Sequence, residues 1–172
     1  MKKSVALLTL TMAVAVAAGC SQSNPPAANA PSADGTKYLL AAEPAGAKSV
    51  KDVRQSVKDG DEVVIVGRIG GSAKPWIEGR AGFWVIDSSV KTCSERPGDM
   101  CDTPWDYCCE TKEDRLQAIA TVKVVDAQGQ TLPVDARKLG LKELQTVVVK
   151  GKAKRDDHGN LTVLASGVYV RP

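Results

Sequence analysis

The segment from Cys93 to Cys109, CSERPGDMCDTPWDYCC, constrains this chain more than any other. It holds four of the five cysteines in 172 residues. Proline and glycine interrupt it too often for a helix or a strand. It also has too few apolar side chains for a core of its own. We therefore expect an insert that is held together by bonds between its side chains and is carried by a regular domain.

The N-terminal residues predict the compartment. Two lysines precede an apolar run, Val5 to Ala18, which is shorter than the roughly 20 residues of a membrane-spanning helix. This pattern is typical of a signal peptide. The run ends in Ala-Ala-Gly-Cys at 17–20, which resembles the lipobox of bacterial lipoproteins. The resemblance implies that residues 1–20 are a lipoprotein signal peptide with its lipobox, and that cleavage leaves Cys20 as the new N-terminus. Cys20 would carry lipid and anchor an exported chain to a membrane, facing the periplasm. Ordinary secretion is the alternative.

The next residues differ in composition. Residues 21–48 are rich in Pro, Ala, Ser and Asn and show no periodic apolar face, which predicts a flexible linker. Within it, the apolar patch Tyr38-Leu39-Leu40 is suited to docking on the domain. Residues 49–172 have the length of one typical domain, and we expect a single one.

This domain is predicted to consist mainly of strands. Ser49 is a good helix N-cap with an acid three residues later, so a short helix should follow it. A second short helix is expected over Leu139–Gln145, and Leu132 to Ala136 is expected to pair back on the strand before it. β-branched or alternating apolar runs predict strands at 62–69, 81–87, 120–125, 146–154 and 161–170.

Five strands with a short helix between the third and the fourth follow the order of an OB-fold. The predicted fold class is thus all-β: a small five-stranded Greek-key OB-fold barrel with one or two short helices and a Cys-rich loop insert at 88–115. The run VKDVRQSVKDGDEVVIVGRIGG resembles the entry to OB domains of the tRNA-anticodon and helicase type. Lys150-Gly151-Lys152-Ala153 resembles the fourth strand of that type. The mature chain as a whole resembles bacterial OB-like lipoproteins, which implies a fold but no activity.

The insert cysteines allow three interpretations. With Cys20 set aside, an even number of cysteines in an exported chain favours two disulfides and no cofactor. Cys108 and Cys109 are adjacent, so each should pair with Cys93 or Cys101. The second interpretation is a copper or zinc site built from these four cysteines, although the C-x-x-C spacing of most zinc sites is missing. The third is a redox-active thiol pair, which lacks the usual C-x-x-C at a helix N-terminus.

Charge is distributed unevenly along the chain. Between Asp87 and Asp114 there are eight acidic residues and three basic ones. The whole chain has a net charge of +3 that includes two lysines of the predicted signal peptide. The mature protein is therefore close to neutral, which argues against a general polyanion-binding surface.

Aromatic residues suggest a ligand-binding face. OB-folds bind single-stranded nucleic acid or oligosaccharide by stacking on their second and third strands. The candidate ligand-binding residues are Trp76, Arg80, Trp84, Trp105, Tyr107 and Lys123. Because the acidic insert lies beside this face and would repel phosphate, nucleic acid is a less favoured partner than a protein or a small ligand. The alternative is that Phe83 and one tryptophan fill the barrel while Trp105 and Tyr107 pack the insert onto it.

No catalytic residues are predicted. His158 is the sole histidine and lies in a turn, so a Ser-His-Asp or histidine-based zinc hydrolase is not expected. No glycine-rich phosphate loop is present. The predicted function is a non-catalytic binding or interaction module, anchored to a membrane through Cys20. The alternatives are a metal-binding or thiol-redox lipoprotein and an OB-fold that binds nucleic acid or oligosaccharide.

Overall fold

The structure is a computed structural model that describes residues 35–172. The predicted signal peptide, the lipidation site Cys20 and the first part of the predicted linker lie outside the described residues. Within the described part of the chain, no helix is long and apolar enough to cross a membrane.

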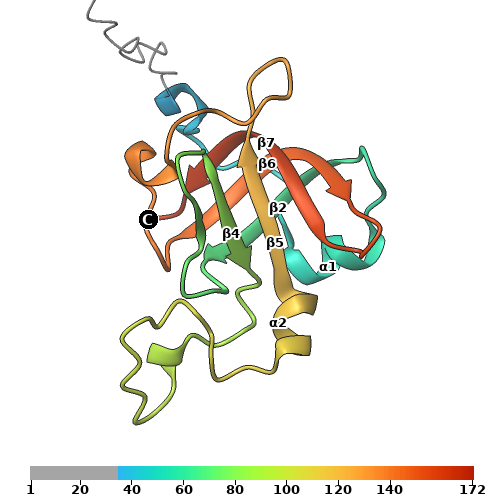
Figure 1. Cartoon of the computed structure of the whole chain (residues 1–172). Coiled ribbons are helices and arrows are strands. Elements are labelled where there is room, and N and C mark those ends of the chain that lie inside the picture. The colour runs from blue at the N-terminus through green and yellow to red at the C-terminus, as the bar shows by residue number, and fades with distance from the viewer. Residues whose placement is uncertain (1–34) are drawn as a thin grey trace, which may run out of the picture.

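Five strands close into a barrel (Figure 1). They are β2 (Glu62–Ile69), β4 (Gly82–Ile86), β5 (Ile119–Val124), β6 (Thr146–Arg155) and β7 (Leu161–Val170). Their order around the ring is β2-β4-β5-β7-β6, and β6 pairs with β2 to complete it. Only β5 and β7 run parallel among these neighbours. The prediction of a small five-stranded all-β barrel is confirmed.

Two short strands lie outside the ring. β1 (Lys48–Ser49) pairs with β2, and β3 (Trp76–Ile77) pairs with β4. The segment Leu132 to Ala136, which was expected to pair back on β5, forms no strand. Instead Thr131 makes a single bridge to Val125, and the N–H of Leu132 donates to the carbonyl of Val124.

The predicted helix after Ser49 is present as α1 (Val50–Ser56). The Ser49 hydroxyl accepts the N–H of Asp52 at 3.1 Å, which satisfies a helix donor that would otherwise lack a partner. The helix at Leu139–Gln145 was wrongly predicted. A 3-10 turn, η3 (Ala136–Leu139), ends at Gly140, whose φ of 85° is left-handed and stops any helix there.

A second helix, α2 (Lys112–Ala118), was not foreseen. Its N-cap Thr111 accepts the N–H of Asp114 at 3.0 Å, and the T-x-x-D pattern was a usable signal. The helix carries the chain from the insert back into β5, so the insert is irregular only as far as Thr111.

The barrel interior is filled by alternate residues of the strands. Phe83 and Val122, which face each other on β4 and β5, are fully buried. Trp76 packs against Phe83 with ring centroids 6.1 Å apart, and its Nε1 donates to Glu143 at 2.6 Å. This agrees with the expectation that Phe83 and one tryptophan fill the barrel. None of the residues in this main core comes from the insert.

The described end of the predicted linker is attached to the barrel. Gly35–Tyr38 form a 3-10 turn, η1, after which Leu39 pairs with Val168 of β7. The N–H of Leu40 donates to the carbonyl of Val168 at 2.8 Å. The apolar patch therefore docks on the domain, as its composition suggested.

The insert forms a lobe at the end of the barrel opposite to η1, the blue turn in Figure 1. Tyr107 is fully buried and packs with Ile86, Val90 and Ala118 in a small second core. Trp105 donates from Nε1 to the carbonyl of Ala73 at 3.2 Å. Trp105 and Tyr107 thus attach the insert to the barrel, in agreement with the alternative given for these aromatics.

Candidate metal centre

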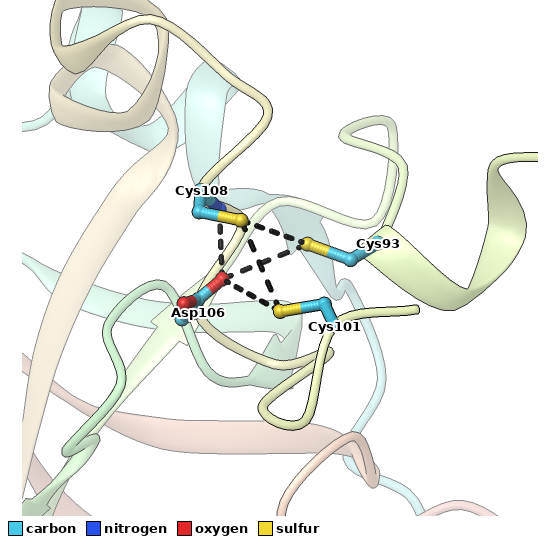
Figure 2. A group of neighbouring side chains, drawn as sticks. All are labelled: Cys93, Cys101, Asp106 and Cys108. Atoms are coloured by element: carbon cyan, nitrogen blue, oxygen red, sulfur yellow. Dashed lines mark hydrogen bonds between the residues drawn. The ribbon is translucent and has the colours of Figure 1, made fainter. Parts of the chain in front are cut away.

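Three cysteines and one aspartate converge within the insert. Figure 2 shows Cys93, Cys101, Asp106 and Cys108 pointing toward one another, and their ligand atoms all lie within 4.8 Å of each other. The sulfur of Cys108 is 3.6 Å from that of Cys93 and 3.9 Å from that of Cys101. Oδ1 of Asp106 is 3.6 Å from the Cys93 sulfur and 4.0 Å from the Cys101 sulfur.

These separations are too long for disulfides, in which the sulfurs lie about 2.05 Å apart. All four insert cysteines are free thiols in the described chain. The two predicted bridges are therefore not found in this arrangement. The structure differs from the prediction in how the sulfurs are grouped. Disulfides would join the sulfurs in pairs, whereas those of Cys93, Cys101 and Cys108 form one group with the carboxylate of Asp106.

The same separations match the edges of a coordination tetrahedron. With Zn–S bonds of about 2.3 Å and a Zn–O bond of about 2.0 Å, sulfur–sulfur edges are about 3.8 Å and sulfur–oxygen edges about 3.5 Å. The four separations given above run from 3.6 to 4.0 Å, and the other pairs of these ligand atoms lie within 4.8 Å. The four atoms are therefore close enough together to hold one small tetrahedral ion.

Local structure positions the buried ligand, Cys93. It begins the 3-10 turn η2 (Cys93–Glu95), where the N–H of Thr92 donates to the Glu95 carboxylate at 2.7 Å. Arg68 of β2 donates to the same carboxylate at 3.0 Å. The Arg68 guanidinium holds the pKa of Glu95 below its usual range. Cys93 is therefore fixed relative to the barrel through Glu95.

Asp106 and Cys108 are positioned by a tight turn. The Cys108 N–H donates to Oδ1 of Asp106 at 2.8 Å, and the Thr103 hydroxyl donates to Oδ2 at 3.1 Å. Tyr107 between them is in the left-handed region, with φ of 57°. Its buried ring holds the turn against the barrel while its two neighbours face the other ligands. Such outer contacts orient ligands in metal sites.

The surroundings of Cys108 oppose ionisation of its thiol in the absence of a cation. Hydrogen bonding with Cys93, Asp106 and Cys101 raises the pKa of Cys108 well above that of an ordinary thiol. Burial would raise the pKa of Asp106, but the Cys108 and Thr103 donors outweigh it and lower that pKa, so the carboxylate is charged. A positive ion among these atoms inverts this balance and favours thiolates.

Cys109 lies outside this group. Its exposed thiol donates to Oδ2 of Asp99 at 3.3 Å, and Oδ1 of Asp99 accepts the N–H of Cys101 at 2.7 Å. Sequence reasoning missed both aspartates. The signal was a repeated D-x-C, at Asp99 to Cys101 and at Asp106 to Cys108, in which each carboxylate accepts the N–H of the cysteine two residues on.

The predicted ligand-binding residues are not gathered in one place. Trp76 belongs to the barrel core and Tyr107 to the second core, while Arg80 is exposed. Trp84 is half-buried and lines a cleft of about 620 Å³ beside α2, which Asp106 also borders. The other five candidates, Trp76, Arg80, Trp105, Tyr107 and Lys123, do not line that cleft. A nucleic-acid or oligosaccharide face on these strands stays a prediction.

Comparison of the sequence with models of known protein families finds no match, and comparison with curated proteins finds none either. Among solved structures, the chain is similar to "OBody AM1L10 bound to hen egg-white lysozyme". The identity is 13% and the TM-score 0.42, over 77% of this chain and 98% of that one. At this TM-score the likeness carries no argument about function or about the type of OB domain.

Proposed function

We propose that this chain is an exported, lipid-anchored β-barrel protein that binds a tetrahedral thiophilic metal ion at Cys93, Cys101, Asp106 and Cys108. The observation that carries the proposal is the set of four sulfur and oxygen separations between 3.6 and 4.0 Å. The Ala-Ala-Gly-Cys sequence ending at Cys20 supports the lipid anchor and the export.

The chemistry of the ligands favours Zn²⁺. Three thiolates exclude Ca²⁺ and Mg²⁺, which prefer shells of six or more oxygens. A carboxylate in the fourth place fits borderline Zn²⁺ better than Cu⁺, which prefers sulfur ligands. Four protein ligands fill the tetrahedron and leave no open position for a substrate, as in structural zinc sites. The centre is therefore non-catalytic.

The ion gives the insert its shape. Because the insert contributes only Tyr107 and Val90 to a buried cluster, packing alone holds little of it. Binding free energy at such a site acts as folding free energy for the segment that supplies the ligands. The domain is then a binding module in which a metal-folded lobe is displayed on the barrel.

Metal content and thiol reactivity test the proposal. Mature protein should contain at least one equivalent of Zn²⁺, and its thiols should react slowly with iodoacetamide until a chelator is added. Asp106→Asn should weaken Zn²⁺ binding at least about tenfold. Asp102→Asn, an exposed carboxylate of the same insert, is the matched control and should bind as the wild type does.

Two results would overturn the metal centre. A metal-free protein without free thiols, lighter than its reduced form by about four hydrogens, would return the cysteines to two disulfides. A metal-free protein with four fast-reacting thiols would favour the redox pair instead.

The lipid anchor has its own test. Labelled fatty acid should enter the wild-type protein, and Cys20→Ala should release the chain from the membrane fraction. A Cys20→Ala protein that stays fully membrane-bound contradicts the anchor without affecting the metal centre.

A further inference from the structure

Cys93 belongs to two sets of ligand atoms. Besides the centre with Cys101, Asp106 and Cys108, its sulfur lies within 4.8 Å of both the Cys109 sulfur and a carboxylate oxygen of Asp99. Those two atoms are themselves in contact, since the Cys109 thiol donates to Oδ2 of Asp99 at 3.3 Å. The second set thus consists of two sulfurs and one oxygen, and the Cys93 sulfur is the one atom that belongs to both sets.

We propose that a second thiophilic cation binds Cys93, Asp99 and Cys109, with the Cys93 thiolate bridging the two ions. The inference rests on the proposed function, because the bridge needs the first ion. A thiolate sulfur has several lone pairs, and soft ligands of this kind suit d¹⁰ ions such as Zn²⁺. On binding, the Cys109 thiol releases its proton to solvent.

The adjacent cysteines support two ions. Two thiolates that reach one zinc ion from a tight turn are usually separated by two residues. Cys108 and Cys109 have no residue between them, and their sulfurs fall in different ligand sets. A single ion leaves Cys109 unused, whereas two ions use each of the four insert cysteines and both D-x-C aspartates.

The second set is open to solvent. Cys93 is fully buried, but Cys109 is exposed. Cys109 and Asp99 border a cleft of about 560 Å³ that is otherwise lined by Lys91, Glu95, Arg96, Pro97 and Gly98. Asp99 forms no ion pair among residues 35–172, and the nearby Arg96 pairs with Glu110. Three protein ligands leave a fourth position for water or another ligand, so this ion is the exchangeable one.

Cadmium titration tests the second site. Reduced, metal-free mature protein is titrated with Cd²⁺, the number of bound ions is read by native mass spectrometry, and alkylation of each cysteine by iodoacetamide is mapped. We expect two Cd²⁺ per chain, with Cys109 protected only when the second ion is bound. Cys109→Ser should bind one Cd²⁺ and keep the first site intact.

Further variants test the ligand and the bridge. Asp99→Asn should lower the affinity for the second Cd²⁺ at least about tenfold, while Asp102→Asn should leave both ions unchanged. Cys93→Ser should lose the second ion and weaken the first, because it removes a ligand from each. A Cys93→Ser protein that retains the second ion would overturn the bridge.

The outcomes separate this inference from the proposed function. If the wild type binds one Cd²⁺ and Cys109 keeps its metal-free alkylation rate, the second site is overturned and the first stands. If Cys109→Ser still binds two ions, the second site is also overturned. If the wild type binds no Cd²⁺, both the inference and the proposed function fall.

Discussion

Asp87 joins the barrel, α1 and the start of the insert. It is 3% exposed. Its Oδ2 accepts the N–H of Lys51 at 2.9 Å and its Oδ1 accepts the N–H of Ser89 at 2.9 Å. Burial alone would raise the pKa of this carboxyl, but the donors of Lys51 and Ser89 outweigh it and lower the pKa below its ordinary value. The charged form is therefore favoured by folding.

Asp87→Asn should destabilise the protein by about 1.5–3 kcal/mol near neutral pH, since hydrogen bonds to a charged group are lost. A lowered folded-state pKa contributes stability above the unfolded value of about 3.9 and loses it as the pH falls through the folded-state pKa. The difference between wild type and variant should therefore shrink at low pH. Urea unfolding at about pH 7 and about pH 3 measures it.

The exposed residue Asp157 serves as the control for this prediction. Its carboxylate accepts no hydrogen bond among the described residues, so Asp157→Asn should leave stability within about 0.5 kcal/mol at both pH values. An Asp87 variant whose deficit stays constant down to about pH 3 would contradict the linkage to this carboxyl.

The proposed metal ligands were only partly predictable at the residue scale. The sequence named Cys93, Cys101, Cys108 and Cys109 as candidates for either disulfides or a metal site, and it favoured disulfides because the chain is predicted to be exported. The choice between a bridge and a metal depends on what lies among the sulfurs, and Asp106 arrives there through a turn around Tyr107 with positive φ. The spacing of the cysteines alone does not predict that turn.

Among the elements, the β6–β7 hairpin has one position that only glycine fits. The register of the two strands shifts between Lys150 and Gly151. A Cβ added at Gly151 would overlap the carbonyl oxygen of Leu164 and lie 2.8 Å from the Cα of Ala165. Backbone atoms cannot move aside as a flexible side chain can, so the close approach of the two strands requires glycine here.

Gly151→Ala should lower the free energy of unfolding by about 1–3 kcal/mol, the usual cost of overpacking. Lys152→Ala on the exposed side of the same strand is the control and should change it by less than about 0.5 kcal/mol. Chemical denaturation of both variants provides the measurement. Equal stability of Gly151→Ala and wild type would show that the two strands can move apart at this position without a loss of free energy of unfolding.

Strands were better predicted than helices. The β2 bounds agree with the prediction because Val63 to Val66 is a β-branched run that is suited to a pleated strand. By contrast, a helix was predicted over Leu139–Gln145, yet Gly140 and Leu144 both have positive φ, and the segment turns instead. A tertiary contact favours the turn over a helix, because the N–H of Leu144 donates to the carbonyl of Ile69 on β2.

At the scale of the whole molecule, the part of the chain that the structure describes has two cores of unequal size. The main core lies inside the barrel and includes no residue of the insert, while the second consists of Ile86, Val90, Tyr107 and Ala118. Replacing Cys93–Cys109 with a short Gly/Ser linker should therefore leave a folded β-barrel. Its stability should fall by about 3–5 kcal/mol, because a fully buried aromatic residue is removed. Circular dichroism and thermal unfolding test this.

Tyr107→Ala separates the loss of the buried ring from the loss of the rest of the insert. The variant lacks the buried ring but keeps every proposed ligand, so its stability should fall by a similar amount. An unfolded linker variant beside a folded Tyr107→Ala protein would mean that the barrel depends on the metal-binding lobe, contrary to our expectation.

The attachment of Leu39 and Leu40 to Val168 has a consequence for orientation at a membrane. It fixes where the chain enters the barrel, at the end opposite to the insert (Figure 1). Fourteen residues separate Cys20 from Gly35, which limits the reach from the anchor to about 50 Å even when fully extended. A lipid on Cys20 would thus hold the barrel within this distance of the bilayer, and the tether would join the barrel at the end that does not carry the insert.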